Sequence, residues 1–189
     1  MENIKIKRKE FEISEIVSKD TYKSIFKNEA YLIKKYDPDS DEFTMLRKLM
    51  KSSISFPTVK YLDKKTGYVA FEWYEGVFLS DYILNNDFNE NIYKQIFRNS
   101  YYARVVGLNL DYSLNKWMLV GDRLIYVGTY CEKYDPRFDF TKSKMREWFM
   151  TKELAAFYEK NGVLFDKKRL KDEFSANKEM VLMTCKYYQ

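Results

Sequence analysis

The sequence contains no histidine, two cysteines, three prolines and six glycines. Without histidine, a histidine general base and a histidine-ligated metal site are both excluded. Two cysteines, Cys131 and Cys185, do not make a disulfide framework, so a reducing compartment is expected. No apolar run approaches the roughly 18 residues of a membrane span, and the N-terminal segment MENIKIKRKE lacks the apolar core of a signal peptide. We therefore expect a cytoplasmic protein without a membrane partner.

The composition is that of a folded chain with a mild excess of basic residues. Apolar residues make up 46% of the 189 positions, which is enough for a packed core and excludes a disordered chain. The net charge is +5, which is compatible with an acidic partner such as a nucleotide or a nucleic acid but does not require one.

The first part of the chain predicts strands followed by a helix. Alternating apolar residues predict a strand over Lys9–Val17, and Ser24–Phe26 and Ala30–Tyr36 complete a three-stranded meander. Asp37-Pro38 is a helix-start signal, because aspartate caps a helix and proline fits its first position. The helix is expected to reach about Lys51.

Glu42 borders the apolar stripe of this predicted helix. The stripe consists of Phe43, Leu46, Leu49 and Met50. A carboxylate that faces inward needs a cation, since an unpaired buried charge costs on the order of several kcal/mol. Lys34, on the preceding strand, is the nearest candidate. Alternatively, Glu42 only interacts favourably with the helix dipole in the first turn.

A second group of elements follows, with a break at Glu75-Gly76. Thr58–Leu62 and Tyr68–Tyr74 are expected strands, and the second is apolar enough to be central in a sheet. The break divides the chain into a first lobe, 1–76, and a second lobe, 77–189. Helices are predicted in the second lobe over Leu79–Asn85, Asn91–Gly107, Ser143–Asn161 and Lys167–Tyr187.

The stretch from 107 to 128 contains the candidate chemistry. Asp111 lies in a short polar loop, and Asn115 follows four residues later. Two short apolar runs, Trp117–Val120 and Leu124–Val127, then flank Gly121-Asp122-Arg123, a pattern typical of a β-hairpin.

This order of elements resembles the protein-kinase fold over about residues 9–160. It is most similar to the minimal atypical kinases, namely the RIO kinases and the small kinase associated with the tRNA-modifying KEOPS complex. The resemblance implies an α+β, two-lobed protein-kinase-like fold. Its N-lobe would be a small antiparallel sheet with one helix, and its truncated C-lobe would be mostly helical.

The resemblance also implies roles for individual residues. Lys34, in Tyr-Leu-Ile-Lys, matches the lysine that holds the nucleotide phosphates, and Glu42 matches its helix partner. Asp111 matches the catalytic aspartate that orients the substrate hydroxyl, and Asn115 would be a metal ligand. Backbone groups of Glu72, Trp73 and Tyr74 would bind adenine, and Ser18, Lys19 and Thr21 would donate hydrogen bonds to phosphate.

Three positions depart from the kinase pattern. Asn109 replaces the histidine that precedes the catalytic aspartate by two residues, and Lys116 occupies the usual asparagine position, so that Asn115 is one residue early. Gly128 replaces the aspartate that binds magnesium. In addition, the predicted phosphate loop, 18–23, has no glycine.

These departures define three hypotheses. The first is a pseudokinase, a nucleotide-binding or regulatory module that acts on a protein partner. The second is an active atypical Ser/Thr protein kinase or small-molecule phosphotransferase that uses Asp111 as its base. The third is an RNA-associated kinase-like protein, suggested by the basic charge. ATP is the implied nucleotide, and Gly128 argues against magnesium.

Overall fold

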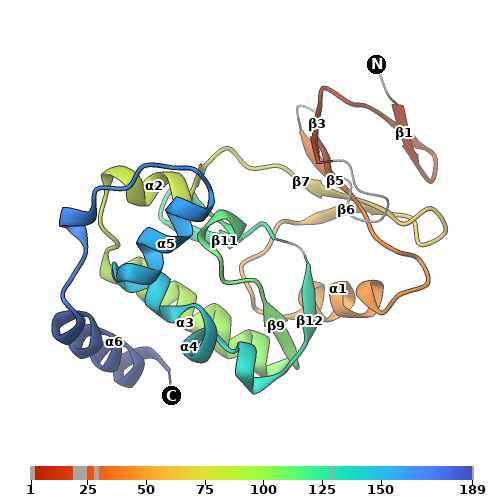
Figure 1. The fold of residues 1–189 in the computed structure, drawn as a ribbon. Helices are drawn as coiled ribbons and strands as arrows, with labels where there is room; N and C mark the ends of the chain where they lie inside the picture. The colour runs from red at the N-terminus through yellow and green to blue at the C-terminus, as the bar shows by residue number, and fades with distance from the viewer. Residues whose placement is uncertain (1–2, 19–24, 28–29, 129, 189) are drawn as a thin grey trace. The chain divides into compact units, whose positions relative to one another are not determined.

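The structure is a computed structural model that describes residues 3–18, 25–27, 30–128 and 130–188. The chain forms two compact units (Figure 1). The first unit comprises residues 1–51 and 56–75, and the second comprises residues 52–55 and 76–189. Among the described helices, none is long and apolar enough to cross a membrane.

The first unit contains a five-stranded antiparallel sheet. Its strands are β3 (Glu15–Ser18), β4 (Ile25–Lys27), β5 (Tyr31–Lys35), β6 (Val59–Leu62) and β7 (Tyr68–Glu72). The strand order is β3-β4-β5-β7-β6. The predicted meander is confirmed by the pairing of β3 with β4 and of β4 with β5. The central position predicted for β7 is also confirmed, because it pairs with β5 on one side and β6 on the other.

The prediction of one strand over Lys9–Val17 was wrong. The segment contains β2 (Lys9–Glu12) and β3, and the strand breaks at Ile13-Ser14. β2 pairs with β1 (Asn3–Ile6) in a separate two-stranded hairpin. Ser14 explains the break, since both its amide and its hydroxyl donate to the Lys27 carbonyl.

Helix α1 (Glu42–Lys51) begins later than predicted. The Asp37 carboxylate accepts the Asp39 amide, so Asp37 closes a local turn and does not cap the helix. The Ser40 hydroxyl accepts the Glu42 amide instead. Met50, predicted in the apolar stripe, is 47% exposed, whereas Phe43, Leu46 and Leu49 are buried.

The second unit is mostly helical around short strands. Its α-helices are α2 (Leu79–Asn85), α3 (Glu90–Val105), α4 (Phe140–Ser143), α5 (Lys152–Lys160) and α6 (Glu173–Tyr187). Its strands are β8 (Val77–Phe78), β9 (Leu108–Leu110), β10 (Trp117–Val120), β11 (Arg123–Tyr126) and β12 (Cys131–Lys133). The 3₁₀ helices are η1 (Leu114–Lys116), η2 (Pro136–Phe138), η3 (Met145–Phe149) and η4 (Lys167–Arg169).

The hairpin predicted after the Asp111 loop is confirmed. β10 pairs with β11 in antiparallel register, and β8 adds a third strand beside β10. A separate pair, β9 with β12, was not predicted; the two strands lie side by side in Figure 1. The α+β class is thus confirmed, with an antiparallel sheet and one helix in the first unit and mostly helices in the second.

Two predicted helices are interrupted. Ser143–Asn161 divides into η3 and α5, because Met150 takes a left-handed conformation with φ of 58°. The Thr151 hydroxyl then donates to the Arg146 carbonyl, which satisfies the broken end. The predicted helix Lys167–Tyr187 is η4 followed by α6. In α3, Ile92, Ile96 and Phe97 are buried, whereas Tyr101 and Val105 are exposed.

Candidate functional site

Asp111 lies directly after the buried strand β9, in the second unit. Its backbone is held on both sides: the Asp111 amide donates to the Tyr126 hydroxyl (3.1 Å), and the Trp117 indole donates to the Asp111 carbonyl (3.0 Å). The next carbonyl, of Tyr112, accepts the Trp148 indole at 2.8 Å. Since the Tyr126, Trp117 and Trp148 side chains are fully buried, they fix the loop rigidly.

The Asp111 side chain itself is exposed. One carboxylate oxygen accepts the Ser113 amide at 2.9 Å, which fixes the rotation of the side chain. A carboxylate can accept about four hydrogen bonds, so capacity remains for a substrate hydroxyl. The loop therefore presents an oriented carboxylate to solvent.

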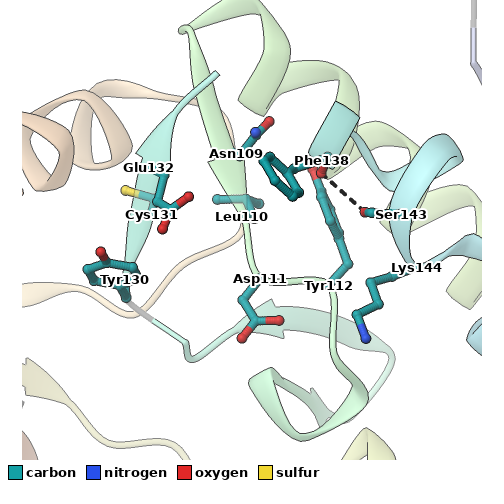
Figure 2. A pocket seen from close by; sticks show the side chains of 10 residues that line it. All are labelled: Asn109, Leu110, Asp111, Tyr112, Tyr130, Cys131, Glu132, Phe138, Ser143 and Lys144. Carbon is teal, nitrogen blue, oxygen red and sulfur yellow. Dashed lines mark hydrogen bonds between the residues drawn. The ribbon is translucent and has the colours of Figure 1, made fainter. Parts of the chain in front are cut away.

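Two cavities of the second unit meet at Asp111 and Lys144, which line both. The smaller has a volume of about 240 Å³ and is also lined by Asn109, Tyr130 and Glu132. Figure 2 shows the Asp111 carboxylate and the Lys144 ammonium at the same end of this cavity. The larger, of about 460 Å³, is lined further by Ser113, Asn115, Lys116, Glu147, Glu153, Ala156, Phe157, Lys160 and Asn161.

An ion pair with Glu147 holds Lys144, which lines both cavities together with Asp111. Its ammonium lies 2.6 Å from a carboxylate oxygen of Glu147, a residue that is 8% exposed. Burial raises the pKa of the Glu147 carboxyl above its usual value, against the opposing effect of Lys144. The Asp111 and Glu153 carboxylates raise it further by repulsion. The site thus combines fixed positive charge with closely spaced carboxylates.

The predicted metal ligand, Asn115, is exposed on η1 and lines the larger cavity with Asp111 and Lys116. The structure thus places Asp111 and Asn115 at one cavity, while the role of Asn115 as a metal ligand stays a prediction. Lys116 contributes positive charge, which opposes a divalent cation. In the described part of the chain, no three His, Cys, Asp or Glu side chains are grouped to hold a metal ion.

Gly128 follows β11 at the position where the kinase pattern has a magnesium ligand. A Cβ atom at this residue would lie 2.6 Å from ring carbon and hydroxyl atoms of Tyr126. The Tyr126 hydroxyl accepts the Asp111 amide and donates to the Tyr130 carbonyl. The space that a side chain at 128 would need is therefore used by the ring that fixes the Asp111 loop. Gly128 offers no ligand atom and Tyr126 leaves no room for a side chain there, so this position does not fit a magnesium site.

Asn109, at the histidine position of the kinase pattern, is buried. Its amide donates to the Asp135 carbonyl at 3.0 Å and so ties β9 to the segment after β12. The Asp135 carboxylate is bound by Arg137, which lowers the pKa of that carboxyl. Glu132, on β12, lines the smaller cavity. Asp135 is thus paired with Arg137, while Glu132 and Asn115 line two different cavities that share Asp111 and Lys144.

Lys34 and Glu42 both belong to the first unit. Lys34 is 8% exposed on β5, where it lies opposite Val69 of β7. Glu42 is half-buried at the start of α1, and its carboxylate accepts the Asp37 amide at 3.0 Å. Glu42 therefore has a definite local role, and its pairing with Lys34 stays a prediction.

The predicted adenine-binding segment continues β7. The amides of Glu72 and Trp73 donate to the carbonyls of Thr58 and Ala30, both at 2.9 Å, so they are already used in the first unit. The Glu72 carboxylate lies 3.2 Å from the Lys60 ammonium, which lowers the pKa of Glu72. An adenine contact through this segment therefore depends on its carbonyls or on the Tyr74 amide.

Most of the predicted phosphate-binding residues lie outside the part of the chain that the structure describes. Lys19 and Thr21 are outside the described residues, and Ser18 is described only as the last residue of β3. Their roles stay predictions.

Two contributors to the site were missed from the sequence. Lys144 has a local signal, since Lys144 and Glu147 have the i, i+3 spacing of helical ion pairs. Tyr126 has none, because nothing in an apolar strand indicates which hydroxyl will reach the Asp111 backbone.

No protein-family model and no curated protein matches the sequence. Among solved structures, the chain is similar to a crystal structure of Rad53 1-466 in complex with AMP-PNP, with 18% identity and a TM-score of 0.45. It is also similar to the BubR1 kinase domain, with 13% identity and a TM-score of 0.47. The matches cover 78% and 89% of this chain, but only 42% and 60% of those chains.

Proposed function

We propose that this chain is a protein-kinase-like nucleotide-binding protein that has lost magnesium-dependent phosphotransfer, that is, a pseudokinase. The observation that carries the proposal is the use of the Gly128 side-chain space by Tyr126. The order of strands, helix, strands and helices, with Asp111 before a hairpin, supports the kinase-like part of the proposal. ATP is the proposed nucleotide.

The residues around Asp111 suggest how such a protein handles a ligand. Tyr126, Trp117 and Ser113 hold the Asp111 loop, so that its carboxylate is ready to accept a hydroxyl. Lys116 and Lys144 place two ammonium groups at the same cavity as Asp111. Fixed lysines can balance phosphate charge as point charges, although they cannot bridge phosphate oxygens as a divalent cation does. This arrangement favours binding over transfer.

An active atypical Ser/Thr kinase or small-molecule phosphotransferase is the second candidate. The observation in its favour is the oriented and exposed Asp111 carboxylate, because that is the geometry a general base needs. The two candidates differ in whether Asp111 is essential to any measurable transfer.

A nucleotide titration tests the proposal. Lys34→Met keeps the aliphatic stem of the buried lysine but removes its charge, so ATP affinity is expected to fall by about 10- to 100-fold, as for loss of a charge-assisted hydrogen bond. Lys35→Met, on the neighbouring and more exposed position of β5, is the matched control and should change affinity by less than about twofold. Thermal midpoints of both variants establish that each is folded.

Two outcomes contradict the proposal. Absence of saturable ATP binding by the wild-type chain removes the nucleotide-binding function. Equal affinity for the Lys34 and Lys35 variants removes Lys34 from the site, and with it the match to the kinase phosphate lysine.

A further inference from the structure

The ammonium of Lys9 lies over three aromatic rings of the first unit. It is 4.7 Å from the ring centroid of Tyr61, 5.1 Å from that of Tyr31 and 5.5 Å from that of Phe11. All three distances are within the range of cation–π attraction. Elsewhere in the described first unit, Lys27 lies over the ring of Trp73 and Lys35 over that of Tyr68.

The three rings form walls around the position of the ammonium. Their centroids are 5.4 to 5.9 Å apart, and their planes meet at 71° to 83°. The rings pack edge to face, and because the Lys9 ammonium lies over all three, their electron-rich faces act on one point, as in aromatic cages that bind ammonium ligands. We name Phe11, Tyr31 and Tyr61 the aromatic cage.

The aromatic cage is assembled from three separate strands. Phe11 is on β2, Tyr31 on β5 and Tyr61 on β6. Phe11 is buried in the core that includes Ile4 and Ile33, and the two tyrosines are half-buried against the same core. The floor of the cage is thus held by the fold, independently of the Lys9 side chain.

Lys9 closes the cage from the solvent side. The residue is exposed, and its ammonium donates to the Tyr61 hydroxyl at 3.0 Å. This hydrogen bond raises the pKa of Lys9 and lowers the pKa of Tyr61. An exposed lysine remains well hydrated, so an ammonium with less hydration can compete for its place.

We propose that the aromatic cage is a binding site for a methylated ammonium group, and that Lys9 occupies the position of the ligand in the free protein. A methylated ammonium keeps the positive charge and gives up N–H groups that would otherwise need water. Its methyl groups also make apolar contacts with the ring faces that a primary ammonium cannot make. A methylated lysine side chain and a choline group share this chemistry. The inference does not depend on nucleotide binding.

The first experiment opens the cage. Lys9→Ala removes the internal competitor, so the affinity for trimethyllysine amide should rise by at least about fivefold over wild type. Lys5→Ala, another exposed lysine on the paired strand β1, is the matched control and should leave affinity unchanged. Binding is followed by NMR through the ring signals of Tyr31 and Tyr61. Choline is titrated in parallel, and the tighter ligand identifies the source of the methylated ammonium.

The second experiment separates ring attraction from hydrogen bonding. In the Lys9→Ala background, Tyr61→Phe keeps the ring and should preserve trimethyllysine binding within about twofold, because a quaternary ammonium has no N–H to donate. Tyr61→Leu in the same background should weaken binding by at least about fivefold. The neutral isostere of choline, 3,3-dimethylbutanol, should not bind saturably.

Several results overturn the proposal. They are equal affinity of wild type and Lys9→Ala, equal losses for Tyr61→Phe and Tyr61→Leu, or equal binding of the neutral isostere. Each would mean that Lys9 only fastens the β1–β2 hairpin to the sheet. If Lys9→Ala does not fold, Lys9→Gln keeps a polar side chain without the charge and is expected to give the same gain in affinity.

Discussion

Replacing Gly128 by alanine tests why this position carries no side chain. The added Cβ would lie 2.6 Å from Cε2, Cζ and the hydroxyl oxygen of Tyr126, closer than real Cβ contacts. The ring is fully buried, and its hydroxyl binds the Asp111 amide and the Tyr130 carbonyl. The ring therefore cannot move aside without loss of both hydrogen bonds.

The expected cost follows from these contacts. Overpacking a buried site costs about 1–3 kcal/mol, and each lost hydrogen bond about 1 kcal/mol. We expect Gly128→Ala to lower the free energy of unfolding by about 2–3 kcal/mol. The two costs do not add in full, because a ring that moves loses its hydrogen bonds but relieves the overlap, and a ring that stays keeps both. Urea denaturation followed by tryptophan fluorescence measures this change. Gly121→Asn is the control: a Cβ there meets nothing within 4 Å, and asparagine tolerates its φ of 57°.

A double-mutant cycle identifies the Tyr126 ring as the cause. Tyr126→Leu shortens the side chain, so Gly128→Ala should cost at least about 1 kcal/mol less in that background than in the wild type. Additive effects, or a neutral Gly128→Ala, would refute the steric explanation. Position 128 could then accept an aspartate, and packing against Tyr126 would not explain why the kinase metal ligand is absent there.

Glu147→Gln should raise the free energy of unfolding at neutral pH, because burial lifts the pKa of Glu147 above 4.5 and so disfavours its charged form in the folded state. This advantage over wild type should vanish as the pH falls from the raised pKa through 4.5, and an advantage independent of pH would contradict it. Glu42→Ala should lower stability by about 1 kcal/mol because the Asp37 amide loses its acceptor, while Glu42→Gln should be nearly neutral. Equal midpoints for both Glu42 variants in thermal denaturation would contradict the role of that hydrogen bond.

Elements fixed by neighbouring residues could be predicted from the sequence. Helix Leu79–Asn85 and strand Trp117–Val120 lie at the predicted bounds, since apolar spacing and the Gly121-Asp122 turn determine them locally. Elements fixed by distant contacts could not. At the break, the Met150 carbonyl accepts the Lys171 amide, a contact from another segment that the local sequence does not indicate.

The same distinction applies to the candidate site. The spacing of Asp111, Asn115 and the hairpin predicted one loop, and Asp111 and Asn115 do line one cavity. The sequence also marked Gly128 as a departure from the kinase pattern, but it did not indicate that a side chain there would overlap Tyr126, because that proximity arises only in the folded chain.

The magnesium dependence of ATP binding tests the central claim most directly. Isothermal titration of the wild-type chain with ATP is compared in the presence of magnesium and in the presence of a chelator. Because position 128 contributes no ligand and Lys116 places a cation at the cavity, the two dissociation constants should agree within about twofold. ATP affinity at least about tenfold tighter with magnesium, or phosphotransfer that Asp111→Asn abolishes, would contradict the pseudokinase proposal and support an active enzyme.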